Sequence, residues 1–160
     1  RSSDLCWLSM ENKALLPKWF REFPGVEWIV ISGQKLPVLD DKYRVTLDVK
    51  GKRLTGSAPE LAAYELLSAV PGTLSFNHAA ELFQGLVNLN PRKVEYLLSV
   101  SQSVQTKRLY LFFASFYEHG WLRRIDSQKI DLGAGKRQIV VNGKFNAQYQ
   151  ITVPERFQKE

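Results

Sequence analysis

The first part of the chain shows the period-two alternation of apolar and polar residues that is typical of strands. From residue 43 to residue 49 every second side chain is apolar, which places these side chains on one face of a half-exposed strand. Gly51 then offers a turn, and residues 52–55 can return as the partner strand of a hairpin. A β-branched and aromatic run at residues 26–31 predicts another strand, and residues 15–20 predict a short helix or turn packed on the sheet.

From residue 57 onward the apolar spacing becomes helical. The sequence Ser-Ala-Pro-Glu predicts a capping box, in which the Ser57 hydroxyl accepts the third amide and Glu60 reaches back to the cap amide. Further helices are expected to begin near Ser75 and at Asn90, and a fourth to end at His119-Gly120. The faces predicted for these three helices are Phe76, Ala79, Ala80, Phe83, Leu86 and Val87; Val94, Leu97 and Leu98; and Leu109, Phe112, Phe113 and Phe116.

The last part of the chain, from Trp121 onward, is again rich in turn and strand signals. Residues 131–135 predict a turn, residues 138–141 a strand, Asn142-Gly143 a tight turn, and residues 149–153 a final strand. We therefore expect a C-terminal strand pair that returns to the N-terminal sheet.

These patterns together predict an α+β fold, with a small, mostly antiparallel sheet packed with a bundle of about four short helices. We expect three segments within one compact domain. They are a strand-rich lobe at 1–56, a helical bundle at 57–120 and a strand and turn segment at 121–160.

Composition adds that the chain is basic and able to form its own core. Its 160 residues are 44% hydrophobic and 24% charged, with a net charge of +6, which excludes disordered and collagen-like classes. The net charges of the three segments are +3, −1 and +4. The basic excess thus lies at the two ends, where it permits attraction to nucleic acid or to an acidic protein.

The one cysteine and the absence of a long apolar run predict where the protein works. Cys6 cannot form an internal disulfide, and a single cysteine fits a reducing compartment. No apolar run approaches the roughly 20 residues of a membrane span, and no signal peptide is visible. We expect a cytoplasmic protein without a membrane partner. Because the chain begins with Arg1 rather than Met, we also expect that it is a piece of a longer protein.

Three residues suggest metal-dependent nuclease chemistry as an alternative function. Asp41 precedes the alternating strand, and Asp48 and Lys50 lie late in it. In such nucleases two carboxylates hold a divalent ion and a lysine assists the attacking water. A solvated polar strand face produces the same pattern, so the interpretation remains an alternative.

Other cofactor and metal sites are not expected. The only histidines are His78 and His119, and no zinc-binding spacing is present. His119, beside a helix-ending glycine, is expected to favour the helix dipole as a cation. The glycine-rich run at 133–137 differs from a phosphate-binding loop because Arg137 replaces the hydroxyl residue and a strand is expected to follow.

Basic pairs supply the candidate interaction surface. No helix-turn-helix spacing accompanies them, so contacts to a DNA backbone or to a protein are expected rather than base reading. We expect the turn at 133–137 to be ordered and partly exposed. The candidate residues are Lys107, Arg108, Arg123, Arg124, Lys136 and Arg137.

Several sequence strings resemble the C-terminal domain of AbiEi-type antitoxins of bacterial abortive-infection systems. In the last third they are K-R-L-Y-L-F-F-A at 107–114, H-G-W-L-R-R-I-D at 119–126, K-I-D-L-G-A-G-K-R at 129–137 and Y-Q-I-T-V-P at 149–154. Earlier strings also fit the family: L-P-K-W-F at 16–20, S-A-P-E at 57–60, E-L-L at 65–67, E-L-F-Q-G-L at 81–86 and L-N-P at 89–91. The resemblance covers nearly the whole chain.

This resemblance implies an antitoxin and transcriptional regulator rather than an enzyme. In the family a winged helix-turn-helix binds operator DNA, and the C-terminal domain neutralises a nucleotidyltransferase-like toxin, directly or indirectly. We therefore expect the cognate toxin as partner, with operator DNA bound through an N-terminal domain that this chain lacks. The resemblance implies no catalytic residues and no cofactor.

Overall fold

The computed structural model describes residues 4–9, 17–22, 24–31 and 35–158, and it separates into two compact units, Arg1–Gln34 and Lys35–Glu160. The fold is α+β, as predicted. The predicted division at residues 56 and 120 remains a prediction. No helix in the described parts is long and apolar enough to cross a membrane.

The first unit contains a two-stranded parallel sheet. Strand β1 (Asp4–Ser9) pairs with β2 (Val26–Ile31), and the short helix α1 (Lys18–Arg21) lies between them in sequence. The strand predicted at 26–31 is confirmed, whereas β1 was not predicted. The predicted helix is confirmed in its second half, and residues 15 and 16 lie outside the described part.

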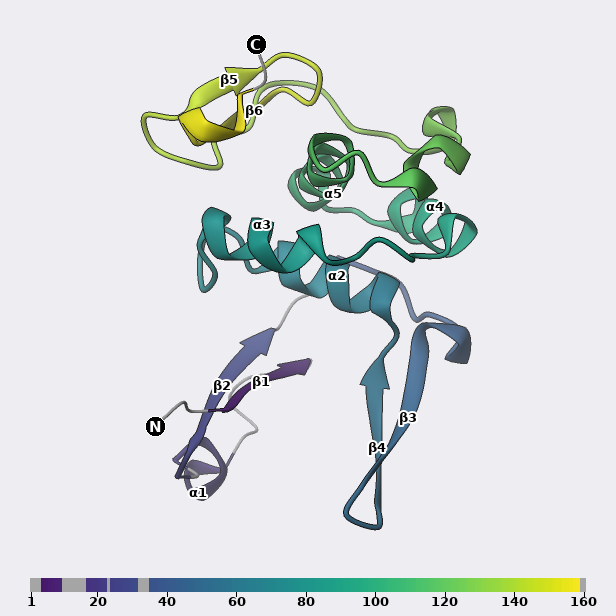
Figure 1. The fold of residues 1–160 in the computed structure, drawn as a ribbon, viewed down its shortest axis with the longest axis vertical. Helices are drawn as coiled ribbons and strands as arrows, with labels where there is room; N and C mark the ends of the chain where they lie inside the picture. Colours follow the sequence, from purple (N-terminus) through teal and green to yellow (C-terminus); the bar gives the residue numbers. More distant parts are fainter. Residues whose placement is uncertain (1–3, 10–16, 23, 32–34, 159–160) are drawn as a thin grey trace. The chain divides into compact units, whose positions relative to one another are not determined.

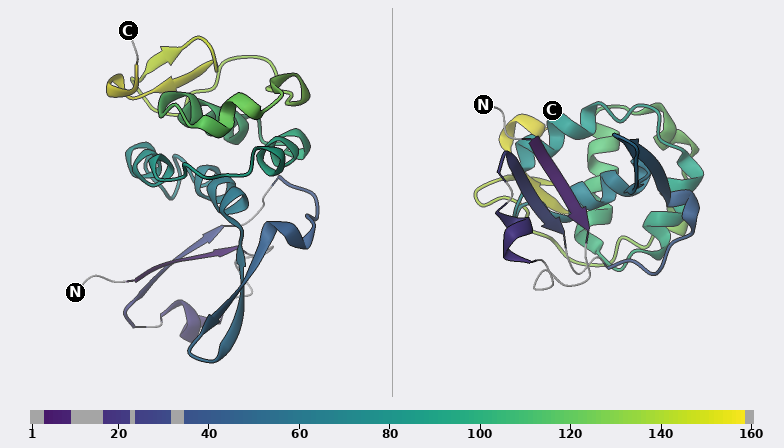
Figure 2. Two further views of the ribbon diagram at one scale, coloured as in Figure 1. Left: turned by 45° about the vertical axis from the view of Figure 1, so that its right-hand side comes forward. Right: turned by 90° about the horizontal axis from the view of Figure 1, so that it is seen from below.

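The second unit begins with the predicted hairpin. A 3₁₀ helix, η2 (Asp41–Tyr43), leads into β3 (Arg44–Val49), which pairs antiparallel with β4 (Lys52–Ser57). Lys50 and Gly51 form the connection with φ angles of 51° and 75°, which is the geometry of a two-residue type I′ turn. In Figures 1 and 2 the hairpin extends away from the start of the next helix.

Helices α2 (Pro59–Ser68), α3 (Phe76–Gln84), α4 (Pro91–Val100) and α5 (Val104–Phe116) form the predicted bundle. Helix α5 is its centre, because every residue from 106 to 114 is buried, and it packs against α2, α3 and the C-terminal strand β6 (Ile151–Val153). The Phe113 ring contacts the rings of both Phe76 and Phe83 in the core. Of the predicted apolar faces, Val87 is exposed and Leu86 lies beyond the end of α3.

The predicted caps are confirmed for α3 and α4 but not for α2. The Ser75 hydroxyl accepts the His78 N–H, and the Asn90 side chain accepts the N–H groups of Arg92 and Lys93. The capping box at 57–60 is wrong. Ser57 still belongs to β4, since the next residue donates its N–H to the Tyr43 carbonyl and so continues the ladder. Glu60 instead accepts the Asn90 N–H, at 2.8 Å, and joins α2 to the start of α4.

The C-terminal segment differs from the prediction in its strands. Two short 3₁₀ helices, η3 (Gly120–Arg124) and η4 (Ser127–Lys129), precede β5 (Lys144–Asn146), which pairs with β6. The predicted strand at 138–141 is wrong: this stretch is a loop whose N–H groups at Ile139 and Val140 donate to the Thr152 hydroxyl. The turn at Asn142 is confirmed.

The C-terminal strand pair does not extend the hairpin of β3 and β4. Among the described strands, β5 and β6 form a sheet of their own, and Figures 1 and 2 show it against α5 rather than against the hairpin. The last strand begins at Ile151 instead of residue 149, because Gln150 has a φ of 52° and lies in a turn. A final 3₁₀ helix, η5 (Glu155–Phe157), brings Phe157 into the core beside Phe76.

Candidate functional site: the basic turn at the start of helix α5

The six candidate basic residues lie in two different environments. Lys107 and Arg108 are on α5 and are only 4% and 2% exposed, so they do not contribute to the exposed surface. The other four are accessible: Arg123 and Arg124 are exposed in η3, Lys136 is exposed and Arg137 is half-buried. Whether these residues bind a partner remains a prediction.

The buried guanidinium of Arg108 holds the basic turn, residues 133–137, and the preceding residue in place. Its Nε donates to the Leu132 carbonyl at 2.8 Å, Nη1 to Gly135 at 2.6 Å and Nη2 to Gly133 at 3.1 Å. A fourth, longer bond runs from Nη1 to the Gln150 carbonyl at 3.4 Å. A charged group in the interior is tolerated only if its hydrogen bonds are made. The carbonyls of the turn therefore stabilise Arg108 while Arg108 fixes their positions.

Two glycines and one carboxylate give the turn its shape. Gly133 and Gly135 have φ angles of 61° and 79°, in the left-handed region that glycine adopts without steric cost. A Cβ on Gly133 would also meet Val104 Cγ2 at 2.8 Å, so the backbone lies close against α5. The Asp131 carboxylate accepts the Gly133 N–H at 2.7 Å. This explains the Asp-Leu-Gly-Ala-Gly string as a local structural motif.

The cationic side chains of the turn remain on its outer side. The backbone of Arg137 makes two hydrogen bonds to the region of the last strand. Its N–H donates to the Gln150 carbonyl, and its carbonyl accepts the Thr152 N–H. The side chain of Lys136 lies over the Phe145 ring, with Nζ at 4.9 Å from its centroid. Burial lowers the pKa of Arg108, and the nearby positive charge of Arg137 lowers it further. The turn therefore concentrates positive charge at the beginning of α5.

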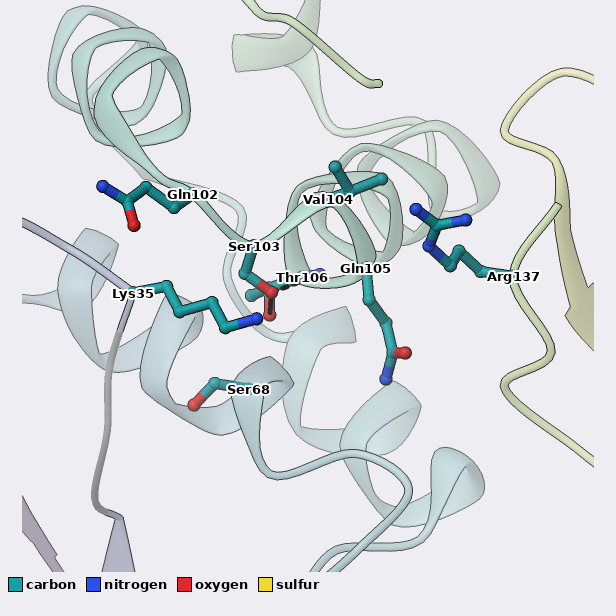
Figure 3. A pocket seen from close by; sticks show the side chains of 8 residues that line it. All are labelled: Lys35, Ser68, Gln102, Ser103, Val104, Gln105, Thr106 and Arg137. Atoms are coloured by element: carbon teal, nitrogen blue, oxygen red, sulfur yellow. Dashed lines mark hydrogen bonds between the residues drawn. The ribbon is translucent and has the colours of Figure 1, made fainter. Parts of the chain in front are cut away.

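A polar cavity of about 340 Å³ lies beside the turn. Figure 3 shows Lys35 and Arg137 on opposite sides of it, with the start of α5 between them. Ser103 caps that helix by accepting the Thr106 N–H. Among the described residues, those that line the cavity include two cations and no carboxylate; the lining consists of Lys35, Ser68, Gln102, Ser103, Val104, Gln105, Thr106 and Arg137. The cavity is thus suited to a negatively charged group.

The structure does not bring the other basic pair to this place. Arg123 and Arg124 follow the C-terminal end of α5, whereas Arg137 lies at its beginning. A helix of 13 residues is about 20 Å long. Helix η4, which follows η3, is held instead by Glu95 on α4, which accepts the Asp126 N–H and the Lys129 ammonium at 2.8 and 2.9 Å. The candidate residues therefore form two separate surfaces.

The alternative nuclease residues are also kept apart. Asp41 lies in η2 before β3, and Asp48 lies near the far end of β3. Four strand residues, 44–47, lie between the end of η2 and Asp48, and they span about 13 Å along the strand. Asp48 accepts the Gly51 N–H at 3.0 Å and Lys50 lies in the turn, so both serve the hairpin. Among the described residues no group of three or more histidine, cysteine or acidic side chains could hold a metal ion.

His119 is buried in the core rather than placed as a cation at the helix end. It is 5% exposed, its Nε2 donates to the Phe83 carbonyl at 3.2 Å, and its ring stacks on Trp121. Burial lowers its pKa, which favours the neutral ring. The expectation of a stabilising positive charge here is wrong because the side chain turns inward.

Sequence reasoning did not find Lys35 or the stretch from Gln102 to Thr106. The Gln102 N–H donates to the Lys35 carbonyl at 2.8 Å, which joins segments 67 residues apart in sequence. The only signal for this part of the site is Ser103 immediately before the helix, which fits an N-cap. Nothing local to Lys35 indicates its place beside the cavity.

Comparison with known proteins supports the resemblance seen in the sequence. A family model described as transcriptional regulator, AbiEi antitoxin, type IV TA system matches residues 3–154. A search of curated proteins and a search of solved structures each find no significant match. Because the family model covers nearly the whole chain, this protein belongs to the AbiEi antitoxin family of type IV toxin–antitoxin transcriptional regulators.

Proposed function

We propose that this chain neutralises a nucleotidyltransferase-like toxin and supports autorepression of its operon, with operator DNA read by a separate N-terminal domain. Family membership supports the antitoxin and regulator role, and the finer assignment follows the resemblance in the sequence strings. The protein would act in the cytoplasm, where both the toxin and the operator are found.

The basic turn is the surface that we propose for contact with the partner. One observation carries this proposal: a buried arginine makes four hydrogen bonds to position an exposed loop. The loop presents Lys136 and Arg137 beside a cavity with a second cation, Lys35. Such a surface matches an acidic protein face or a phosphate backbone. Arg123 and Arg124 would form a second, separate contact surface.

We further propose that the chain has no catalytic role. This interpretation is supported by the positions of Asp41 before β3 and Asp48 near its far end, and by the use of Asp48 in the hairpin turn. Alanine at both positions should leave toxin neutralisation unchanged. A loss of growth rescue by this double variant, with the fold retained, would favour the nuclease alternative.

Growth rescue provides the test of the proposed surface. The toxin encoded beside this protein is expressed alone, with this 160-residue chain, and with the chain carrying Lys136→Ala and Arg137→Ala. The wild-type chain should restore growth, and the double variant should do so poorly. Arg123→Ala with Arg124→Ala removes the same charge at the other end of α5, and it should have the smaller effect.

Operator binding is measured in parallel with the protein joined to its DNA-binding domain. The variant with Lys136→Ala and Arg137→Ala would lose two phosphate contacts, so its affinity for the operator should be lower and should depend less on salt concentration. If growth rescue and operator affinity both remain at the wild-type level for the 136 and 137 variant, the basic turn is not the contact surface.

A further inference from the structure

The hairpin of β3 and β4 leaves an apolar face open. Val45, Leu47 and Leu54 point to the same side of the hairpin and are 36%, 49% and 52% exposed. A two-stranded hairpin is marginally stable in water unless another strand or a helix joins it. The hairpin is therefore suited to extension by a further strand.

The edge of β3 that faces away from β4 has backbone groups available for such pairing. The Ala58 N–H bonds to the Tyr43 carbonyl at 2.7 Å, and antiparallel ladders alternate, so the odd-numbered residues of β3 bond to β4. Arg44, Thr46 and Asp48 then direct their backbone groups outward. The Arg44 N–H already bonds to the Asp41 carbonyl. No other described residue makes a backbone bond to this edge, so the Arg44 carbonyl and the backbone N–H and C=O groups of Thr46 and Asp48 are available within the described part of the chain.

The sequence of β3 is self-complementary about Thr46. In an antiparallel pair of two β3 strands with Thr46 opposite Thr46, Arg44 of each copy faces Asp48 of the other. Val45 then lies opposite Leu47 on the apolar face. Opposite charges and apolar pairs at facing positions favour a strand pair, and like charges oppose it. Registers centred on Arg44 or on Asp48 would place identical charges opposite each other, and those centred on Val45 or on Leu47 would place a charge opposite Thr46. Of these registers, only the one centred on Thr46 pairs opposite charges.

The edge of β4 does not have these properties. Its outward residues are Arg53, Thr55 and Ser57, and pairing about Thr55 would place arginine opposite serine. Lysine and glycine are features that disfavour edge pairing, and β4 contains both, at Lys52 and Gly56, whereas β3 contains neither. The two edges of one hairpin thus differ in their ability to pair.

We propose that β3 forms a two-fold symmetric pair with β3 of a second copy of this chain. The product is a four-stranded antiparallel sheet in the order β4-β3-β3-β4, with two reciprocal Arg44–Asp48 ion pairs. The apolar side chains Val45, Leu47 and Leu54 of both copies then lie on one continuous face. An interface of this kind is isologous, as in most homodimers. A pair of short strands buries less than the roughly 1,200 Å² of a standard interface, so the association depends on protein concentration.

Sedimentation of the whole 160-residue chain over a concentration series tests the proposal. The wild type is expected to shift from monomer to dimer as concentration rises. Thr46→Pro removes the N–H at the centre of the pair and should abolish dimerisation. Its control is Thr55→Pro, directly across the hairpin, which removes an outward N–H from the other edge and should leave the dimer intact. Circular dichroism checks that both variants retain the fold.

Charge reversal tests the register. Arg44→Asp and Asp48→Arg should each raise the dissociation constant at least tenfold, and the double variant should restore it because the two charges exchange places. A wild type that remains monomeric at all accessible concentrations overturns the proposal and would mean that another molecule or segment covers the apolar face. A dimer that survives Thr46→Pro also overturns it, as does a double variant that fails to recover although its circular dichroism spectrum matches that of the wild type.

Discussion

Helix α5 buries a basic side chain near its start, and another follows just beyond its end. Arg108 donates to the carbonyls of Leu132, Gly133, Gly135 and Gln150, and His119 donates to that of Phe83. Burial lowers the pKa of both groups. Arginine retains its charge in proteins in spite of such shifts, whereas a histidine with a lowered pKa is neutral at pH 7.

The difference shows what each buried base can do for the fold. A permanent cation with five donors can gather several carbonyls at once and so order a loop that has little core of its own. A neutral imidazole makes one bond here and otherwise packs as an aromatic ring, stacked on Trp121. The exposed basic turn therefore depends on one side chain far away in sequence, and the helix end depends on ordinary core packing.

The largest effect is expected from Arg108→Met, which removes all four hydrogen bonds while it retains much of the side-chain volume. Hydrogen bonds to charged groups contribute about 1.5–3 kcal/mol each, and water can replace part of that at an exposed turn. We expect a loss of about 3–5 kcal/mol in the free energy of unfolding, measured by urea denaturation. Hydrogen exchange should show the turn opening.

Two further variants serve as controls: Arg108→Lys separates charge from geometry, and Arg124→Met changes an exposed arginine. Arg108→Lys keeps the charge but has no planar fork, so it should recover only a small part of the stability. Arg124→Met, at an exposed site, should cost less than about 0.5 kcal/mol. Full stability in the lysine variant would show that charge alone holds the turn.

A smaller effect is expected from Gly133→Ala at the same end of α5. The left-handed backbone costs about 1–2 kcal/mol for a residue with a Cβ, and the 2.8 Å approach to Val104 adds a steric cost. We expect about 2–3 kcal/mol of destabilisation in total. Thermal unfolding of the purified variant measures it.

The neighbouring glycine is a matched control for this steric cost. Gly135 also has a positive φ, but a Cβ there would meet only Arg137 Nη1, at 3.5 Å, so Gly135→Ala should cost about 1 kcal/mol. In a double variant, adding Val104→Ala to Gly133→Ala should reduce the destabilisation caused by the alanine at 133 to about that of Gly135→Ala. Equal losses for the two single variants would contradict the close packing of the turn on α5.

The sequence was informative where the structure is determined locally. The hairpin at residue 50 and the starts of α3 and α4 at Ser75 and Asn90 follow from short-range signals, and all were predicted. The capping box failed because Ala58 continues the strand ladder by its bond to Tyr43. That bond joins residues on different elements, and no local pattern encodes it.

The candidate site was predictable only in part, for the same reason. The run at 133–137 was recognised as a basic turn, but Arg108 was assigned to the surface because a charged residue beside an apolar run usually lies there. Its inward position depends on carbonyls 24 to 42 residues later in the chain. The strand predicted at 138–141 failed similarly, since the Thr152 hydroxyl takes the N–H groups that a strand partner would need.

The smallest effect, at the other end of the helix, is a pH dependence from His119. Because the folded state lowers the pKa of this group, the unfolded chain binds the proton more readily. Neutral His119 makes its full contribution to the free energy of unfolding above about pH 6.5, the pKa of histidine in the unfolded chain. The free energy of unfolding falls as the pH decreases below that value. His119→Gln can still donate to the Phe83 carbonyl, and it should flatten the dependence of unfolding free energy on pH between about 7 and 5. His78→Gln leaves His119 in place and should retain the slope. If the unfolding free energy of His119→Gln depends on pH as steeply as that of the wild type, the buried His119 is not held neutral by the fold.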